Sequence, residues 1–91
     1  MDAYGYRGKE SMTKDECAKV YAVKYVLDYN TFRKSDRLKR DLVDIRLRYE
    51  VNEDAEFTRL FERYCEDLRK NRRETPRWAR LIMAERYALN V

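Results

Sequence analysis

Glycine and proline are almost missing from this chain. The two glycines precede Glu10 and the one proline follows Thr75. Tight turns between short strands need glycine, proline or an Asn-Gly pair, whereas helices can be joined through a polar capping residue. This scarcity argues against a fold of short strands and favours helices. Long apolar runs are missing too, so we expect no membrane-spanning segment and no secretory signal.

Histidine is absent, and the two cysteines, Cys17 and Cys65, form no Cys-x-x-Cys pair. Without histidine there can be no Ser-His or Cys-His catalytic dyad, and no glycine-rich phosphate loop is present. Glu62, Glu66 and Asp67 suit a solvated helix face better than an acid–base or metal site. We therefore expect a protein that is not an enzyme, with no cofactor, no metal and no small-molecule substrate.

The cysteine pattern fits reduced, buried thiols in a cytoplasmic protein. If the first and third predicted helices run in the same direction, Cys17 and Cys65 differ in height by roughly 12 Å at 1.5 Å per residue. That separation is beyond the reach of a disulfide.

Charged residues make up 42% of the 91 residues and aromatic residues 13%. Regular apolar spacing and capping residues predict one helical domain, residues 11–91, after a flexible N-terminal arm, residues 1–10. We expect about four helices in an antiparallel bundle, since the connections are short; they span 13–33, 36–51, 53–71 and 76–89. Their expected N-caps are Thr13 (paired with Glu16), Ser35, Asn52 and Thr75.

Residues 43–51 alternate apolar and polar side chains, which is also a strand pattern, so an α+β fold is the alternative. The lack of a flanking turn signal favours a helix. As a helix, this segment carries a second apolar stripe, Val43, Leu47 and Val51, opposite the first. The last helix should bury Trp78, Leu81, Ile82 and Leu89, with Met83 and Tyr87 pointing the other way. A homo-oligomer interface formed by Val43, Leu47, Val51, Met83 and Tyr87 is therefore expected.

Basic residues gather at two helix junctions, which an antiparallel bundle places at the same pole. Fourteen of the 21 cationic side chains are arginine, which suits planar contacts to phosphate or carboxylate. Several sit in first turns, where the helix dipole disfavours cations. The candidate binding residues are Arg33, Lys34, Arg37, Lys39, Arg40, Arg69, Lys70, Arg72, Arg73, Arg77, Trp78 and Arg80. The junction at the opposite pole carries Glu50, Glu53, Asp54 and Glu56.

This pattern predicts a small, non-enzymatic protein that binds nucleic acid or associates with nucleoprotein through an arginine-rich pole. The alternative is a regulatory or inhibitory module that docks the same pole on an acidic surface of a larger protein. A third possibility is self-assembly of the basic pole of one copy on the acidic pole of the next.

Overall fold

The computed structural model describes residues 12–27, 35–70 and 74–88. Its helices are α2 (Lys14–Leu27), α3 (Asp36–Ile45), the π-helical stretch η2 (Arg46–Glu50), α4 (Ala55–Lys70) and α5 (Arg77–Tyr87). The described residues contain no strand, and 43–50 are helical, so the predicted all-α fold is confirmed and the strand alternative is wrong. The predicted arm, residues 1–10, and the predicted extension of the first helix over 28–33 lie outside the described residues.

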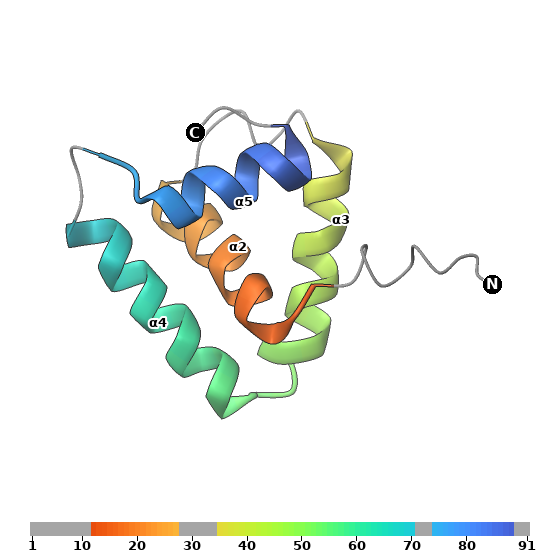
Figure 1. The fold of residues 1–91 in the computed structure, drawn as a ribbon. Helices are drawn as coiled ribbons and strands as arrows, with labels where there is room; N and C mark the ends of the chain where they lie inside the picture. The colour runs from red at the N-terminus through yellow and green to blue at the C-terminus, as the bar shows by residue number, and fades with distance from the viewer. Residues whose placement is uncertain (1–11, 28–34, 71–73, 89–91) are drawn as a thin grey trace.

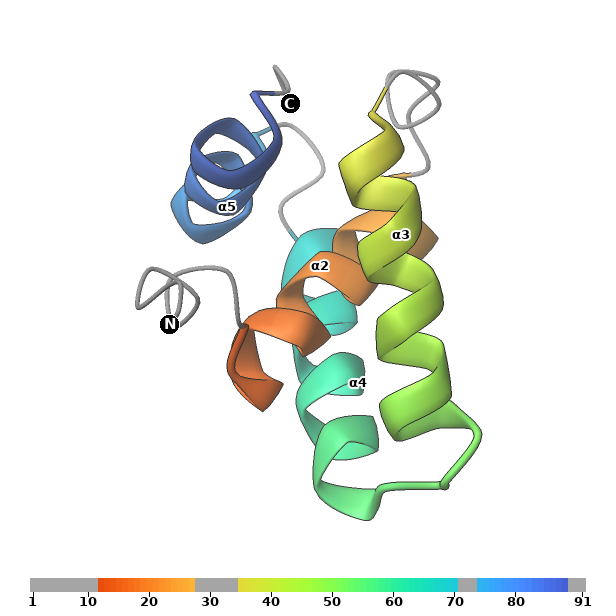
Figure 2. The ribbon, with the colours of Figure 1, turned by 90° about the vertical axis from the view of Figure 1, so that its right-hand side faces the viewer.

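Helix α2 lies at the centre of the molecule, with α4 on one side, α3 on the other and α5 crossing it (Figures 1 and 2). Helix α4 lies beside α2 and runs in the same direction, as expected for the first and third helices of the predicted bundle. Helix α5 runs across α2 from the end of α4 towards the start of α3 (Figure 1).

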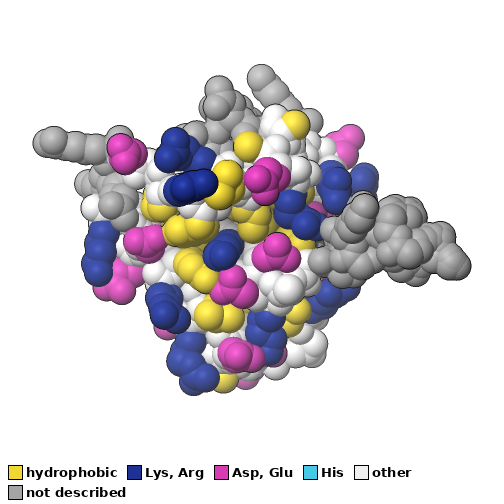
Figure 3. Space-filling view, viewed as in Figure 1, with side chains coloured by type: hydrophobic (Ala, Val, Ile, Leu, Met, Phe, Trp, Pro, Cys, Tyr) yellow, Lys and Arg dark blue, Asp and Glu magenta, His cyan; other side chains and the backbone are white. Residues whose placement is uncertain are grey.

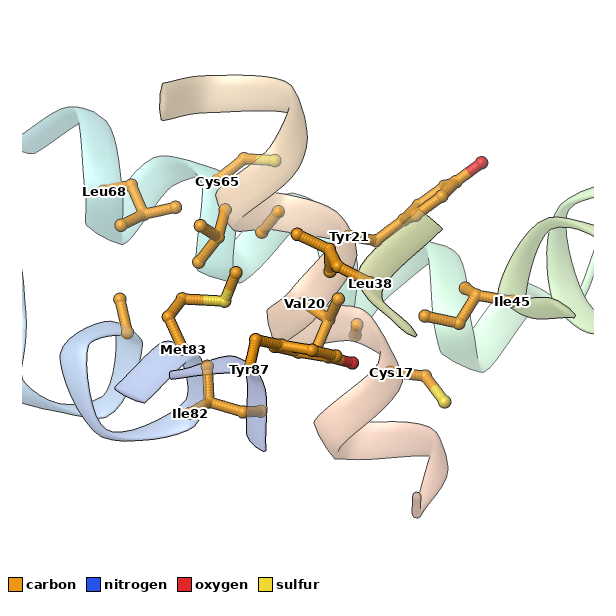
Figure 4. Packing of buried hydrophobic residues seen from close by; sticks show 14 of the residues in the cluster. Cys17, Val20, Tyr21, Leu38, Ile45, Cys65, Leu68, Ile82, Met83 and Tyr87 are labelled. Atoms are coloured by element: carbon orange, nitrogen blue, oxygen red, sulfur yellow. The ribbon is translucent and has the colours of Figure 1, made fainter. Parts of the chain in front are cut away.

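The central position of α2 follows from its side chains, which are apolar or small around most of the helix. Six of its residues are buried: Cys17, Ala18, Val20, Tyr21, Ala22 and Val23. A helix that is apolar around most of its circumference must be covered by neighbours, and alanines let those neighbours come close. Figure 4 shows Leu38, Cys65 and Met83 from the surrounding helices converging on this core.

Two of the predicted helix caps are confirmed. The Thr13 N–H donates to Glu16 Oε1 at 3.0 Å and the Glu16 N–H donates to Thr13 Oγ1 at 3.1 Å, which is a reciprocal capping box. At the start of α3, the Leu38 N–H donates to Ser35 Oγ at 3.1 Å. Each bond satisfies a backbone donor that has no partner within the helix.

The predicted cap at Asn52 is wrong, because Asp54 caps α4 instead. The Phe57 N–H donates to Asp54 Oδ1 at 2.9 Å, and Glu53 just before it has a left-handed φ of 54°. The Asn52 amide turns back and donates to the carbonyl oxygens of Leu47, at 3.3 Å, and Arg48, at 2.9 Å. Asn52 therefore closes the preceding helix and does not start the next one.

The predicted cap at Thr75 is also wrong. Helix α5 begins at Arg77, one residue later than expected, and its N-cap is Pro76 with ψ of 148° and no side-chain hydrogen bond. Thr75 thus lies one residue outside the capping position.

The predicted buried face of the last helix needs correction. Met83 is 0% exposed and Tyr87 is 7% exposed, so neither is available as an oligomer interface, whereas Leu81 is 41% exposed. The face that packs on α2 is built on Ala79, whose small side chain allows close approach, and the following Ile82, Met83 and Tyr87 lie one and two turns further on. The expected core residue Leu89 lies outside the described residues.

Candidate nucleic-acid interface

The basic side chains predicted to bind an anionic partner lie at helix ends, on the surface. Helix α3 begins with Arg37, Lys39 and Arg40, α4 ends with Arg69 and Lys70, and α5 begins with Arg77 followed by Arg80. All seven are exposed. The four other predicted basic residues lie outside the described residues: Arg33, Lys34, Arg72 and Arg73.

Helix α5 divides these seven residues into two patches. Its first residues lie against the last turns of α4, where the Trp78 Nε1–H donates to Asp67 Oδ2 at 2.6 Å. Its last turn reaches α3, where the Tyr87 hydroxyl donates to Asp41 Oδ2 at 2.6 Å. We name the cations near the α4–α5 junction the α4–α5 patch (Arg69, Lys70, Arg77 and Arg80) and those at the start of α3 the α3 patch (Arg37, Lys39 and Arg40). Within the α4–α5 patch, Arg69 lies on a groove of α4 together with Arg63 and Glu66. The 11 residues of α5 span roughly 16 Å between them.

Most of these cations are not held by carboxylates. Among the described residues, Arg40, Arg69, Lys70, Arg77 and Arg80 take part in no ion pair, while Lys39 Nζ lies 3.8 Å from Asp36 Oδ1. Other ion pairs join Lys14 of α2 to the start of α4 and run along α2 and along α3 and η2. The cations of the α4–α5 patch are therefore open to an external anion.

Trp78, which the sequence analysis included among the binding residues, is used inside the fold. Its ring is half-buried with its centroid 4.9 Å from that of Tyr64, and its N–H is satisfied by Asp67. A ring held by two helices in this way is poorly placed to stack on a base. Trp78 therefore serves the packing of α4 against α5, and the candidate interface consists of the basic residues alone.

The acidic residues at the opposite pole are partly neutralised. Lys14 Nζ lies 2.9 Å from Asp54 Oδ2 and 3.0 Å from Glu56 Oε1, which joins the first turns of α2 and α4. Hydrogen bonds to these two carboxylates, first Asp54, raise the pKa of Lys14. The pKa of Asp54 is lowered first by the Phe57 backbone N–H and then by Lys14. Glu50 in turn accepts a hydrogen bond from the Tyr21 hydroxyl.

The face of the molecule between the two poles carries charges of both signs. Figure 3 shows blue and magenta side chains interspersed there, with apolar side chains between them. On α4 the exposed Arg59 and Arg63 alternate with Glu56, Glu62 and Glu66 along a shallow groove. Such a balanced face is the normal surface of a charged helix. Arg69 of the α4–α5 patch borders the same groove, whereas Arg77 and Arg80 on α5 do not, so Arg59 and Arg63 differ in setting from the two α5 arginines.

The two thiols are buried and unpaired, at 1% exposure for Cys17 and 3% for Cys65. Burial raises the pKa of Cys17 to about 11 and also raises that of Cys65, so both stay protonated near neutral pH. Across residues 12–27, 35–70 and 74–88 no group of three Cys, Asp or Glu side chains could hold a metal ion. None of the described helices has the length and apolar content needed to cross a membrane.

Comparison with protein-family models, with curated proteins and with solved structures found no match to this chain.

Proposed function

We propose that this protein binds nucleic acid without catalysis, through phosphate contacts made by the α4–α5 patch and the α3 patch. The observation that carries the proposal is the placement of Arg77 and Arg80 in α5 and of Arg37, Lys39 and Arg40 in α3. Of these cations, Arg37 and Arg77 lie in the first turn of their helix, where the helix dipole disfavours a cation by roughly 0.3–1 kcal/mol, and the others follow within the next three residues. An anion bound at these helix ends offsets that cost and meets unsatisfied backbone N–H groups as well.

A nucleic-acid backbone suits these patches better than a protein surface does. Binding hot spots between proteins centre on well-packed Trp, Tyr and Arg side chains. Trp78, which follows Arg77 in α5, is already committed to Asp67 and Tyr64. What is left is a set of exposed cations, which fits the sequence-independent readout of phosphates.

The experiment is a fluorescence-anisotropy titration of duplex DNA, single-stranded DNA and RNA, each of random sequence, at about 50 and 200 mM salt. If all seven described cations contact phosphates, the logarithm of affinity falls with the logarithm of salt at a slope of about −6 on duplex DNA. The Arg77→Ala/Arg80→Ala variant should weaken binding to all sequences similarly and make that slope shallower by about 2.

The matched control is Arg59→Ala/Arg63→Ala, which removes the same charge from the balanced face of α4. It should change the slope by much less than the α5 variant. Equal effects of the two variants would mean that net charge alone drives binding and would overturn the assignment of the patch. Absence of binding at low salt would overturn nucleic-acid binding itself and favour an acidic protein partner.

A further inference from the structure

The outer face of α3 and η2 carries an apolar stripe that no other part of the described chain covers. Val43, Leu47 and Val51 are each 59% exposed. On the inner side of the same helix Leu38 and Ile45 are 0% exposed, so the stripe lies on the side away from the core. Tyr25, 57% exposed, extends it, since Tyr25 and Val43 line one groove between α2 and α3.

The π-helical stretch holds this stripe in line. The Val51 N–H donates to the Arg46 carbonyl at 2.9 Å, five residues back, which is the π-helical bond. A wider turn brings residues four apart closer to a straight row than an α-helix does. The inner side is anchored where the Tyr49 ring stacks on Phe57, with centroids 4.8 Å apart.

Charges flank the stripe in a self-complementary order. On one flank Asp44 precedes Arg48, with Arg48 Nε 3.1 Å from Asp44 Oδ2. On the other flank the order is reversed, since Arg46 precedes Glu50, with Arg46 Nε 3.9 Å from Glu50 Oε1. All four side chains are about half exposed or more, so each can exchange its partner within the chain for one outside it.

We propose that this face binds a second copy of the chain, with the two α3–η2 segments antiparallel about a two-fold axis at Leu47. Leu47 then meets Leu47 of the second copy, and Val43 lies opposite its Val51. The equivalent flanks of the two copies face each other. Asp44 then lies about 3 Å from Arg48 of the second copy, measured along the helix axis. Arg46 stands in the same relation to Glu50 of the second copy, which gives reciprocal ion pairs on both flanks.

The charge at the ends of the segment selects the antiparallel arrangement. It brings the basic start of one α3, with Arg37 and Arg40, towards the acidic turn of the other copy at Glu53 and Asp54. A parallel pair would place the two basic starts side by side, and like charges so placed repel. The antiparallel pair also opposes the two helix dipoles favourably.

The stripe is small, so the two copies should associate weakly. Three aliphatic side chains and one tyrosine cover well below the roughly 800 Å² per partner of a standard stable interface. The dimer is therefore weak and concentration-dependent, and ion pairs at its rim make it weaker as salt rises. This inference concerns a different surface from the α4–α5 patch and does not depend on nucleic-acid binding. It shares Arg37 and Arg40 with the α3 patch, so in the dimer these two side chains lie towards the acidic turn of the second copy.

Sedimentation equilibrium of the full chain, from low micromolar to near-millimolar concentration, tests the dimer. Leu47→Asp should abolish dimer formation without loss of helical circular dichroism, since the side chain is exposed. The control is Leu81→Asp, the same change at the 41% exposed position on α5, which should leave the dimer intact. A monomer at every concentration, or equal loss in both variants, would overturn the proposal.

A charge swap tests the orientation. Asp44→Arg disturbs two symmetry-related pairs and should raise the dimer dissociation constant about tenfold. Asp44→Arg/Arg48→Asp should restore it in the antiparallel dimer, where these two residues pair with each other. In a parallel dimer Asp44 faces Arg46 of the second copy, so the same swap would not restore association and would overturn the antiparallel arrangement.

Cysteine cross-linking provides a second readout of orientation. A mixture of Val43→Cys and Val51→Cys chains should form the mixed disulfide, and either variant alone should form little. The native thiols do not interfere because both are buried. Efficient cross-linking of Val43→Cys with itself would contradict the antiparallel geometry.

Discussion

At the scale of single residues, the helices are linked by aromatic side chains that donate hydrogen bonds to carboxylates. Tyr64 donates to Asp15, Tyr21 to Glu50, Tyr87 to Asp41 and Trp78 to Asp67. Each bond joins two helices, so the apolar ring packs in the core while its polar atom is satisfied by a charged acceptor. Burial, followed by the carboxylate, raises the pKa of each of the three tyrosines.

These pKa shifts predict a loss of stability at alkaline pH. Burial and the Asp15 carboxylate raise the pKa of Tyr64 to about 12, against about 10 in an unfolded chain. The stabilisation from this residue is complete below pH 10 and is lost as the pH rises towards 12, since the unfolded chain releases its proton first. The midpoint of urea unfolding should therefore fall across this window, and fall less steeply in Tyr64→Phe. Parallel curves for the wild type and the variant would contradict this role of Tyr64.

At the scale of helices, a polar residue just before the apolar stripe fixes the start of α3 and of α4, but not that of α5. Ser35 satisfies a backbone donor of α3, and Asp54 does so for α4, whereas α5 begins after Pro76 with no side-chain bond. Serine and asparagine are both good N-caps, so Asn52 was as reasonable a candidate from the sequence as Ser35. The choice between Asn52 and Asp54 depends on the left-handed turn at Glu53, which the local sequence does not reveal.

Substituting the used and the unused caps should separate them. Ser35→Ala removes the acceptor of the Leu38 N–H and should lower the free energy of unfolding by about 1 kcal/mol. Thr75→Ala removes no cap of α5 and should cost less than half as much. Urea unfolding at one pH measures both, and comparable losses would place Thr75 back in a capping role.

At the scale of the whole molecule, the arrangement depends on which helix the others surround. Helix α2 is covered by α3, α4 and α5, while the two-faced helix α3 stays at the periphery with one stripe exposed. The same placement separates the basic residues into two patches at the ends of α5 and lets Lys14 neutralise part of the acidic pole. Positive and negative charges are therefore less separated between the two poles than a simple antiparallel bundle would produce.

One substitution at two positions tests this placement. Val23 is 0% exposed in α2 and Val43 is 59% exposed in α3. Val23→Ala leaves a cavity in the core and should cost about 2 kcal/mol in free energy of unfolding. Val43→Ala, measured where the chain is monomeric, should stay within about 0.5 kcal/mol of the wild type. Equal costs would mean that α3 is buried on both sides and α2 is not the centre.

The sequence by itself determined the helical class, the capping box at Thr13 and Glu16 and the cap at Ser35. These features depend on residues within a few positions of one another, so their physics is local. The sequence also predicted that basic residues lie near helix ends, because the expected helix bounds already place them there.

Only the tertiary structure decided which apolar face is covered and which polar atom finds a partner. Met83 and Tyr87 were expected outside and lie in the core, because α5 approaches α2 along the face that begins at small Ala79. Trp78 was removed from the candidate interface by Asp67, eleven residues earlier in the chain, on another helix. Burial and long-range pairing depend on how helices cross, and a single helix pattern with two apolar faces is compatible with several crossings.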